Sequence, residues 1–293
     1  VGRWTLTPGL RFEDIDQSRV RYETRFGRTA DPASRSNSNI RDTRSNNTQA
    51  WLPGMGVLYE INNSTVLIGG VHKGFTAPSN APGVNEEEAI NYELGIRFDN
   101  ERFRAELTGF LSDYDNLLGE CTSSSGSDCE VGDAFNGDAA TVKGFELVVA
   151  TDLAPEAGLR VPLEVAYTYI DGEFDTNIAD TDFFGDVTKG DPIPYIPEHQ
   201  LQATIGVVAN RWAVHVSASY IDEVCARASC GLFEKTEDSL TFDVAGQFKL
   251  TERVNLFARV ENLTDANDIM GRQPYGARHK KSRTAAIGIN IRL

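Results

Sequence analysis

Alternation of apolar and polar residues with a period of two is the feature of this sequence that most restricts its fold. It is clearest near the C-terminus, where Ile287, Ile289 and Ile291 alternate with polar or small residues. Successive side chains of a β-strand point to opposite faces, so the pattern predicts strands with one apolar and one polar face. Similar stretches recur along the whole chain and predict about twelve strands. Their ranges are 3–15, 51–61, 64–75, 88–98, 102–116, 140–152, 160–171, 199–209, 211–222, 240–250, 254–261 and 284–293.

The length of these strands indicates their surroundings. Strands of soluble proteins have about 5–6 residues, whereas strands that span a membrane need about 9–11. Most of the predicted strands reach the longer class. The fold class predicted is therefore all-β, an antiparallel transmembrane β-barrel.

The connections between the predicted strands alternate between two kinds. Tight turns fall at Asn62-Asn63, Asp99-Asn100, Asn210 and Thr251-Glu252, with a slightly longer one at 153–159. Long polar stretches lie near 16–50, 117–139, 172–197, 223–238 and 265–282. Short periplasmic turns and long extracellular loops are typical of outer-membrane barrels.

Aromatic residues gather beside the tight turns, as in an interfacial girdle. They are Tyr59, Phe98, Phe103, Trp212 and Phe248. The alternative is that these side chains form the core of a soluble β-protein.

Composition excludes some classes of protein. The 293 residues contain no run of 18 apolar residues, so the sequence predicts no transmembrane helix. No secretory signal peptide opens the chain at Val1. The formal net charge of −15 argues against nucleic acid as a partner, because phosphates would be repelled.

The four cysteines form two pairs that are close in sequence, Cys121 with Cys129 and Cys225 with Cys230. Four cysteines allow three pairings, and the sequence does not choose among them. Two short-range disulfides are the simplest interpretation and imply an oxidising compartment. A zinc site is the alternative, but the spacings are wide and no histidine is near, so no metal site is predicted.

Seven segments, taken in order, resemble TonB-dependent outer-membrane receptors, and particularly the ferric-citrate (iron dicitrate) receptor branch. They are TPGLRFEDID (7–16), PGMGVLYEINNSTVLIGGVHKGFTAPS (53–79), EEEAINYELGIRFDNERFRAELTGFLSDYDNLLG (86–119), VKGFELVV (142–149), IPYIPEHQL (193–201), VENLTD (260–265) and KSRTAAIGINIRL (281–293). Each motif is weak alone, and their common order is what makes the resemblance specific.

The resemblance implies that residues 1–293 are the C-terminal portion of a barrel of about 22 strands, with the plug domain absent. Family members engage TonB through the N-terminal plug region, lie in the outer membrane of Gram-negative bacteria, and contact lipid and lipopolysaccharide. They import a ferric chelate without covalent chemistry, so neither an enzyme activity nor a cofactor is expected. Members of this family also tend to end in an aromatic residue, whereas this chain ends in Leu293.

Arginines in two long loops are the candidate ligand-binding residues. Residues 19–44 contain seven arginines against three acidic residues, a local charge of +4 in an acidic chain. Guanidinium groups bind carboxylates bidentately, which suits an anionic ferric citrate complex. The residues chosen are Arg21, Arg25 and Arg28, followed by Arg272 and Arg278 in the last long loop. The alternative is that such arginines contact lipopolysaccharide phosphates or solvent.

The sequence also allows other cargoes and two other classes of outer-membrane barrel. The cargo could be another siderophore, haem or cobalamin. A complete barrel of about twelve strands would instead indicate an autotransporter translocator or an outer-membrane lipase. His215 and Ser217 share one face of a strand, as a lipase would need, but no third residue to orient them is evident.

Overall fold

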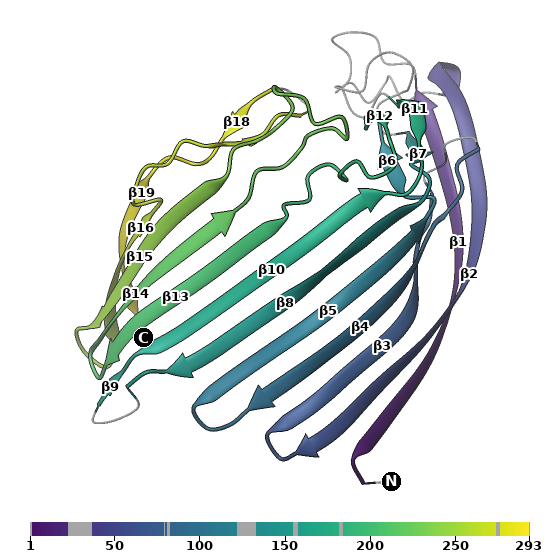
Figure 1. The fold of residues 1–293 in the computed structure, drawn as a ribbon. Helices are drawn as coiled ribbons and strands as arrows, with labels where there is room; N and C mark the ends of the chain where they lie inside the picture. Colours follow the sequence, from purple (N-terminus) through teal and green to yellow (C-terminus); the bar gives the residue numbers. More distant parts are fainter. Residues whose placement is uncertain are drawn as a thin grey trace.

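The chain forms one large antiparallel sheet that curves into an open trough (Figure 1). The computed structural model describes residues 2–22, 37–78, 80, 83–121, 133–154, 158–181, 184–273 and 276–292. Twelve strands follow one another in the order β1-β2-β3-β4-β5-β8-β10-β13-β14-β15-β16-β19. The first and last of them do not pair, so this part of a barrel wall is not closed. The predicted fold class is confirmed.

The twelve strands have the following bounds: β1 Trp4–Tyr22, β2 Ile40–Asn62, β3 Thr65–Thr76, β4 Glu87–Asp99, β5 Phe103–Asp115, β8 Ala140–Asp152, β10 Pro162–Phe174, β13 His199–Ala209, β14 Trp212–Ile221, β15 Ser239–Lys249, β16 Val254–Glu261 and β19 Thr284–Ile291. A short strand, β9 (Leu159–Arg160), pairs with β13. Three two-stranded hairpins stand apart from the large sheet: β6 (Leu118–Glu120) with β7 (Ala134–Asn136), β11 (Ile178–Thr181) with β12 (Gly185–Val187), and β17 (Ile269–Gly271) with β18 (Arg278–His279). A 3₁₀ turn, η2, covers Asn37–Asn39. Among these described residues, no helix is long and apolar enough to span a membrane.

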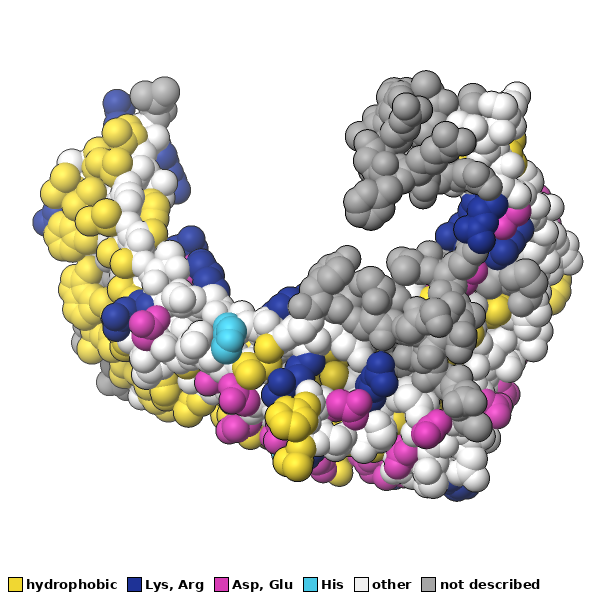
Figure 2. Space-filling view, turned by 90° about the horizontal axis from the view of Figure 1, so that it is seen from above, with side chains coloured by type: hydrophobic (Ala, Val, Ile, Leu, Met, Phe, Trp, Pro, Cys, Tyr) yellow, Lys and Arg dark blue, Asp and Glu magenta, His cyan; other side chains and the backbone are white. Residues whose placement is uncertain are grey.

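The sheet has an apolar outer face and a polar inner face. In β4, the outward Leu94 is 71% exposed, whereas the inward Glu93 lines a polar hollow. Figure 2, seen from above, shows hydrophobic side chains covering the outer surface of one limb of the trough. An apolar surface of this kind is stable against lipid and not against water.

Two aromatic pairs bracket the apolar band on the first hairpin. Trp4 and Tyr59 lie 4.4 Å apart between ring centroids, and Phe12 and Trp51 lie 4.7 Å apart. Eight residues separate Trp4 from Phe12 along β1, which is about 27 Å of strand. At a tilt of about 40° this spans roughly 20 Å of membrane thickness, close to the apolar band of known barrels.

Beyond this band, β1 and β2 continue as an extension whose faces are both polar. Residues 16–22 and 40–50 belong to these strands, so the prediction of a loop across 16–50 is wrong at both of its ends. The backbone pairing continues unchanged through Ser18↔Ser45. The apolar–polar alternation disappears there because neither face meets lipid, although the ladder of backbone hydrogen bonds persists.

The tight turns lie at one end of the sheet, as the sequence predicted. Asn100 closes the β4–β5 turn, because its side-chain oxygen accepts hydrogen bonds from the N–H groups of Arg102 (2.9 Å) and Phe103 (2.8 Å). Phe98 and Phe103 lie on either side of this turn, 6.0 Å apart between ring centroids. Aromatic residues therefore mark the periplasmic boundary of the band.

At the opposite end, the outer loops pack on one another around a small apolar core. Phe174 and Val187 are buried there, and the Phe184 ring lies 5.0 Å from Phe174 and 5.4 Å from Phe135. These rings join the end of β10 to the β6–β7 and β11–β12 hairpins. The core holds the outer segments in place above the wall.

Candidate ligand-binding site

Three arginines converge on the inner side of the β1–β2 extension. Arg19 pairs with Arg44 across the two strands, and Arg21 lies opposite Asp42. Because directly opposed residues share a face, all four side chains point to the same side of the hairpin. Figure 2 shows Lys and Arg side chains gathered on the inner side of this limb.

Asp133 is the common partner of the three arginines. Its carboxylate accepts a hydrogen bond from Arg19 at 3.0 Å, lies 3.6 Å from Arg44, and forms an ion pair with Arg21. Arg44 also pairs with Asp42 at 3.2 Å. Asp133 immediately precedes β7, so these ion pairs attach the start of β7 to the first hairpin of the wall.

The cluster Arg19, Arg21, Arg44, Asp42 and Asp133 is half-buried. In the part of the chain that the structure describes, three guanidinium groups face two carboxylates here. The side chains of Arg21 and Asp133 are only 10% and 16% exposed. Like charges placed opposite one another, as Arg19 and Arg44 are, repel unless a counterion lies between them. Asp133 is that counterion, and the three guanidinium groups around it form a site of the kind that binds carboxylates.

The five predicted ligand-binding arginines do not lie together. Arg21 belongs to the cluster and is paired with Asp133. Arg25 and Arg28 lie outside the described residues. Arg272 donates from Nε to the Lys235 backbone carbonyl, and Arg278 donates from Nη2 to the Gln273 carbonyl at 2.6 Å.

Arg272 and Arg278 are therefore not brought together with Arg21. Arg272 directly follows β17 and Arg278 begins β18, in the hairpin at the edge of the sheet opposite to β1 and β2 (Figure 1). Sequence reasoning did not select Arg19, Arg44 or Asp133. The register of β1 on β2 identifies the two arginines as neighbours. In this register the numbers of two paired residues add up to 63, as they do for Arg19 and Arg44.

The middle of the inner wall is acidic. Glu93, Glu106 and Glu146 line a hollow of about 390 Å³ together with Asn91 and Thr108. Arg97 neutralises one of these carboxylates by a bidentate pair with Glu106, at 2.8 and 3.0 Å. An anion that has passed the outer arginines thus meets an acidic surface in the middle of the inner wall.

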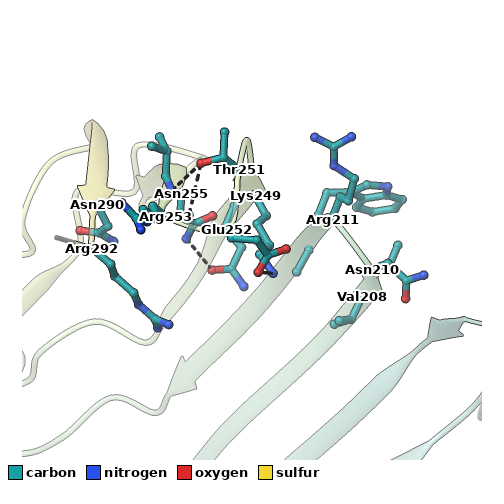
Figure 3. Close-up of a pocket in the computed structure, with 15 residues that line it drawn as sticks. Val208, Asn210, Arg211, Lys249, Thr251, Glu252, Arg253, Asn255, Asn290 and Arg292 are labelled. Atoms are coloured by element: carbon teal, nitrogen blue, oxygen red, sulfur yellow. Dashed lines mark hydrogen bonds and ion pairs between the residues drawn. The ribbon is translucent and has the colours of Figure 1, made fainter.

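The periplasmic end of the inner wall is basic again (Figure 3). A hollow of about 360 Å³ is lined by residues of the β13–β14 and β15–β16 turns and by the end of β19. Lys249 is paired with Glu252 at 2.9 Å, and the Arg211 guanidinium lies 5.6 Å from the centroid of the Phe248 ring. Arg253 and Arg292 add two further positive charges to this hollow.

The His215–Ser217 pair lies on the inner face but has no geometry for catalysis. The Ser217 hydroxyl lies 2.9 Å from the Thr204 hydroxyl on the neighbouring strand. Within the described part of the chain, no hydrogen bond joins His215 to a carboxylate that could orient it. These residues are polar side chains of the inner wall.

Two of the predicted cysteines, Cys225 and Cys230, form a disulfide bond in the outer segment after β14. Cys121 is also disulfide-bonded, at the end of β6, and Cys129 lies outside the described residues. These bonds brace outer segments, in keeping with an oxidising compartment.

An antiparallel wall with an apolar outer band, a polar inner face, tight turns at one end and long connections at the other defines an outer-membrane β-barrel. A family model described as "TonB dependent receptor-like, beta-barrel" matches residues 1–263. The chain belongs to this family. Its known members and relatives are outer-membrane receptors and transporters of Gram-negative bacteria.

Individual relatives are distant. The vitamin B12 transporter BtuB of Photobacterium profundum is 21% identical over 240 residues, which is 77% of this chain and 36% of that protein. Several solved structures cover 99% of this chain, and two of them serve as examples. The siderophore receptor PiuA from Acinetobacter baumannii has a TM-score of 0.77 at 17% identity, and the unliganded ferric citrate transporter FecA has 0.75 at 19%. The chain spans 41% and 43% of these two proteins.

Proposed function

We propose that this chain is the C-terminal part of the barrel of a TonB-dependent outer-membrane receptor that imports an anionic ferric chelate, ferric citrate in the first instance. The single observation that carries the proposal is the half-buried cluster of Arg19, Arg21 and Arg44 on the inner side of the outer extension. The plug region would engage TonB, and the chelate would pass between the plug and this wall to the periplasm.

The chemistry of a ferric chelate explains why arginine suits this site. The chelator fills the coordination sphere of the iron, so the protein recognises the charge and shape of the shell. Guanidinium groups present planar pairs of N–H donors that match carboxylates, and they stay charged at every physiological pH. Partial burial strengthens such contacts because water screens them less.

The proposal also gives Asp133 a role. Its carboxylate is held by all three arginines, so it occupies the place that a ligand carboxylate would take or adjoin. An incoming chelate would share the guanidinium donors with Asp133 or displace it. Displacement would release the link between the first hairpin and the start of β7.

The direct test is isothermal titration calorimetry of the full-length receptor with ferric citrate, iron-free citrate and a hydroxamate siderophore. Calorimetry is preferable to tryptophan fluorescence, because Trp4, Trp51 and Trp212 lie on the outward face. We expect saturable binding of ferric citrate only. The variant Arg19→Ala/Arg44→Ala should lose at least about tenfold in affinity, since each charged hydrogen bond contributes about 1.5–3 kcal/mol.

The matched control is Arg11→Ala. Arg11 lies on the same strand and the same inner face, but 67% of its side chain is exposed, and its one ion pair with a described residue is to Glu13, at 3.0 Å. This variant should bind ferric citrate as the wild type does. Equal losses in both variants would refute a role for the cluster, and absence of ferric citrate binding would refute the cargo.

The alternative cargo within the same class is cobalamin, which the relation to a vitamin B12 transporter favours. Cobalamin carries no cluster of carboxylates, so the outer arginines would contribute little to its affinity. Titration with cyanocobalamin under the same conditions distinguishes the two cargoes. Saturable binding that is insensitive to Arg19→Ala/Arg44→Ala would support cobalamin.

A further inference from the structure

Three side chains that commonly bind transition metals meet at the outer ends of β13 and β14. Glu198, His199 and Asp222 each offer one ligand atom, and these atoms lie within 4.8 Å of one another. Glu198 directly precedes β13 and Asp222 directly follows β14, where its N–H donates to the His199 carbonyl at 3.0 Å. The backbone pairing of the two strands therefore brings the three residues together.

The group faces outward and is separate from the inner wall. His199 is the cross-strand partner of Tyr169, and its ring lies 5.3 Å from Tyr169 and 6.1 Å from Tyr167. Phe145, which is 39% exposed, lies 5.7 Å from both tyrosines. This ring cluster corresponds to the outer aromatic boundary of the band, so the three residues lie at the outer membrane surface.

Tyrosine hydroxyls adjoin each of the three side chains. The Tyr167 hydroxyl lies 2.8 Å from Nδ1 of His199, and the Tyr220 hydroxyl donates to Asp222 at 3.2 Å. The Tyr169 hydroxyl is within interaction range of the Glu198 carboxylate. Partners of this kind fix the orientation of metal ligands, and the Tyr167 contact leaves Nε2 of the imidazole as the free nitrogen.

The surroundings attract a cation. Asp171 is paired with Lys143 at 2.9 Å and Glu223 with Lys235 at 2.6 Å, so these four charges cancel. Glu198, Asp222 and the nearby Asp238 have no ion pair among the described residues. Three carboxylates without a described cationic partner thus lie beside one imidazole.

We propose that Glu198, His199 and Asp222 form a binding site for a divalent transition metal ion of the zinc class, on the outer surface of the barrel and apart from the cargo path. One imidazole nitrogen and two carboxylates form a donor set that suits Zn²⁺ and leaves a fourth position for water. Tetrahedral ligands on zinc lie about 3.3 Å apart, so the exposed Glu198 side chain has only to close on the other two.

We expect a bound metal ion to hold two outer segments together. Glu198 ends the segment that follows β12, and Asp222 begins the segment that leads to β15. The same two segments already meet where the Tyr195 N–H donates to the Cys225 carbonyl at 2.9 Å, beside the Cys225–Cys230 disulfide. A bound ion would add a second link between them.

The test uses the full-length receptor in detergent, carrying an affinity tag without histidine and stripped with a chelator. Calorimetric titration with Zn²⁺, and with Co²⁺ followed by its visible absorption, should give one site that is lost in His199→Gln and in Asp222→Asn. Tyr167→Phe should weaken binding by about 10–100-fold, the effect typical of an orienting partner. Ca²⁺ and Mg²⁺ should not compete.

Two controls keep the result specific. His215→Gln on the inner wall and His279→Gln, whose Nδ1 lies 2.9 Å from the Asn267 carbonyl oxygen, should bind as many ions as the wild type. Equal stoichiometry in His199→Gln and the wild type would overturn the proposal, as would competition by Ca²⁺. The affinity for ferric citrate should not change in His199→Gln. The zinc titration therefore tests the metal site, and the ferric citrate titration tests the cargo independently.

Discussion

The first hairpin of the wall contains two regions with the same backbone and opposite surface chemistry. Between the Trp4–Tyr59 and Phe12–Trp51 pairs its outward face is apolar, and the strands are held against lipid. Beyond Phe12 the outward positions carry Asp14, Asp16 and Asn47, and the Asn47 side-chain amide donates to each of the two carboxylates at 2.8 Å. The antiparallel register continues through both regions without a shift until Arg21.

This difference shows that two kinds of interaction stabilise one hairpin. Burial of apolar surface in lipid stabilises the lower region and is insensitive to pH and salt. The outer region depends on ion pairs and hydrogen bonds such as those of Asp133, which protonation or screening weakens. Variants and conditions should therefore separate the two regions.

The largest effect is expected from a charge placed in the apolar band. Leu94→Arg puts a guanidinium on the outward face at a position that is 71% exposed to lipid. The free energy of unfolding in lipid vesicles should fall by about 2–4 kcal/mol, measured by urea titration of the full-length receptor. Ser18→Arg, outward on the extension, is the matched control and should change it by less than about 0.5 kcal/mol. Equal losses would mean that the apolar band extends further outward than the aromatic pairs indicate.

A smaller, local effect is expected from Asp133→Asn. This change removes the carboxylate charge that Arg19, Arg21 and Arg44 share, so the repulsion between Arg19 and Arg44 across the hairpin increases. The free energy of local opening of residues 16–22 and 40–50 should fall by about 1–3 kcal/mol, seen as faster amide hydrogen exchange. Residues 4–12 should exchange as before. Faster exchange along the whole hairpin would show that the two regions are not energetically separate.

The smallest effect concerns pH and is confined to the outer segments. The pKa of Glu234 lies below its ordinary value, because the Gly231 N–H and the Ser229 hydroxyl donate to its carboxylate at 3.0 and 2.9 Å and Arg227 lies nearby. Because the pKa of Glu234 is lower in the folded protein, its negative charge stabilises the folded outer segment above about pH 4.3. This stabilisation is lost as the pH falls through the folded pKa.

Hydrogen exchange of residues 225–236 should therefore differ between the wild type and Glu234→Gln near neutral pH, with the wild type slower. The difference should vanish once the pH has fallen through the lowered folded pKa of Glu234, because the carboxyl is then protonated in the wild type too. Exchange in the middle of β4 should be equal in the two proteins at every pH. A difference that persists in acid would assign the effect to the glutamine side chain and not to the charge.

The strands within the membrane band could be predicted from the sequence, because lipid on one side and polar groups on the other impose a period of two. The tight turns followed for the same reason: Asn100 and Asn62 are residues whose side chains replace backbone partners in a turn. The outer extension was missed since both of its faces are polar. Its arginines were recognised as a basic stretch, but their grouping was not.

The sequence alone therefore determined the class of fold, the inward and outward faces of each strand and the order of the strands in the wall. Only the tertiary structure decided which charged groups meet. Arg19 meets Arg44 through the register of two long strands, and both meet Asp133, which is 114 residues from Arg19 in the sequence and directly precedes β7. Likewise Glu198 and Asp222 are 24 residues apart and become neighbours through the pairing of β13 with β14. Periodicity is a local property that a sequence displays directly, whereas long-range contacts depend on register and on the path of the loops.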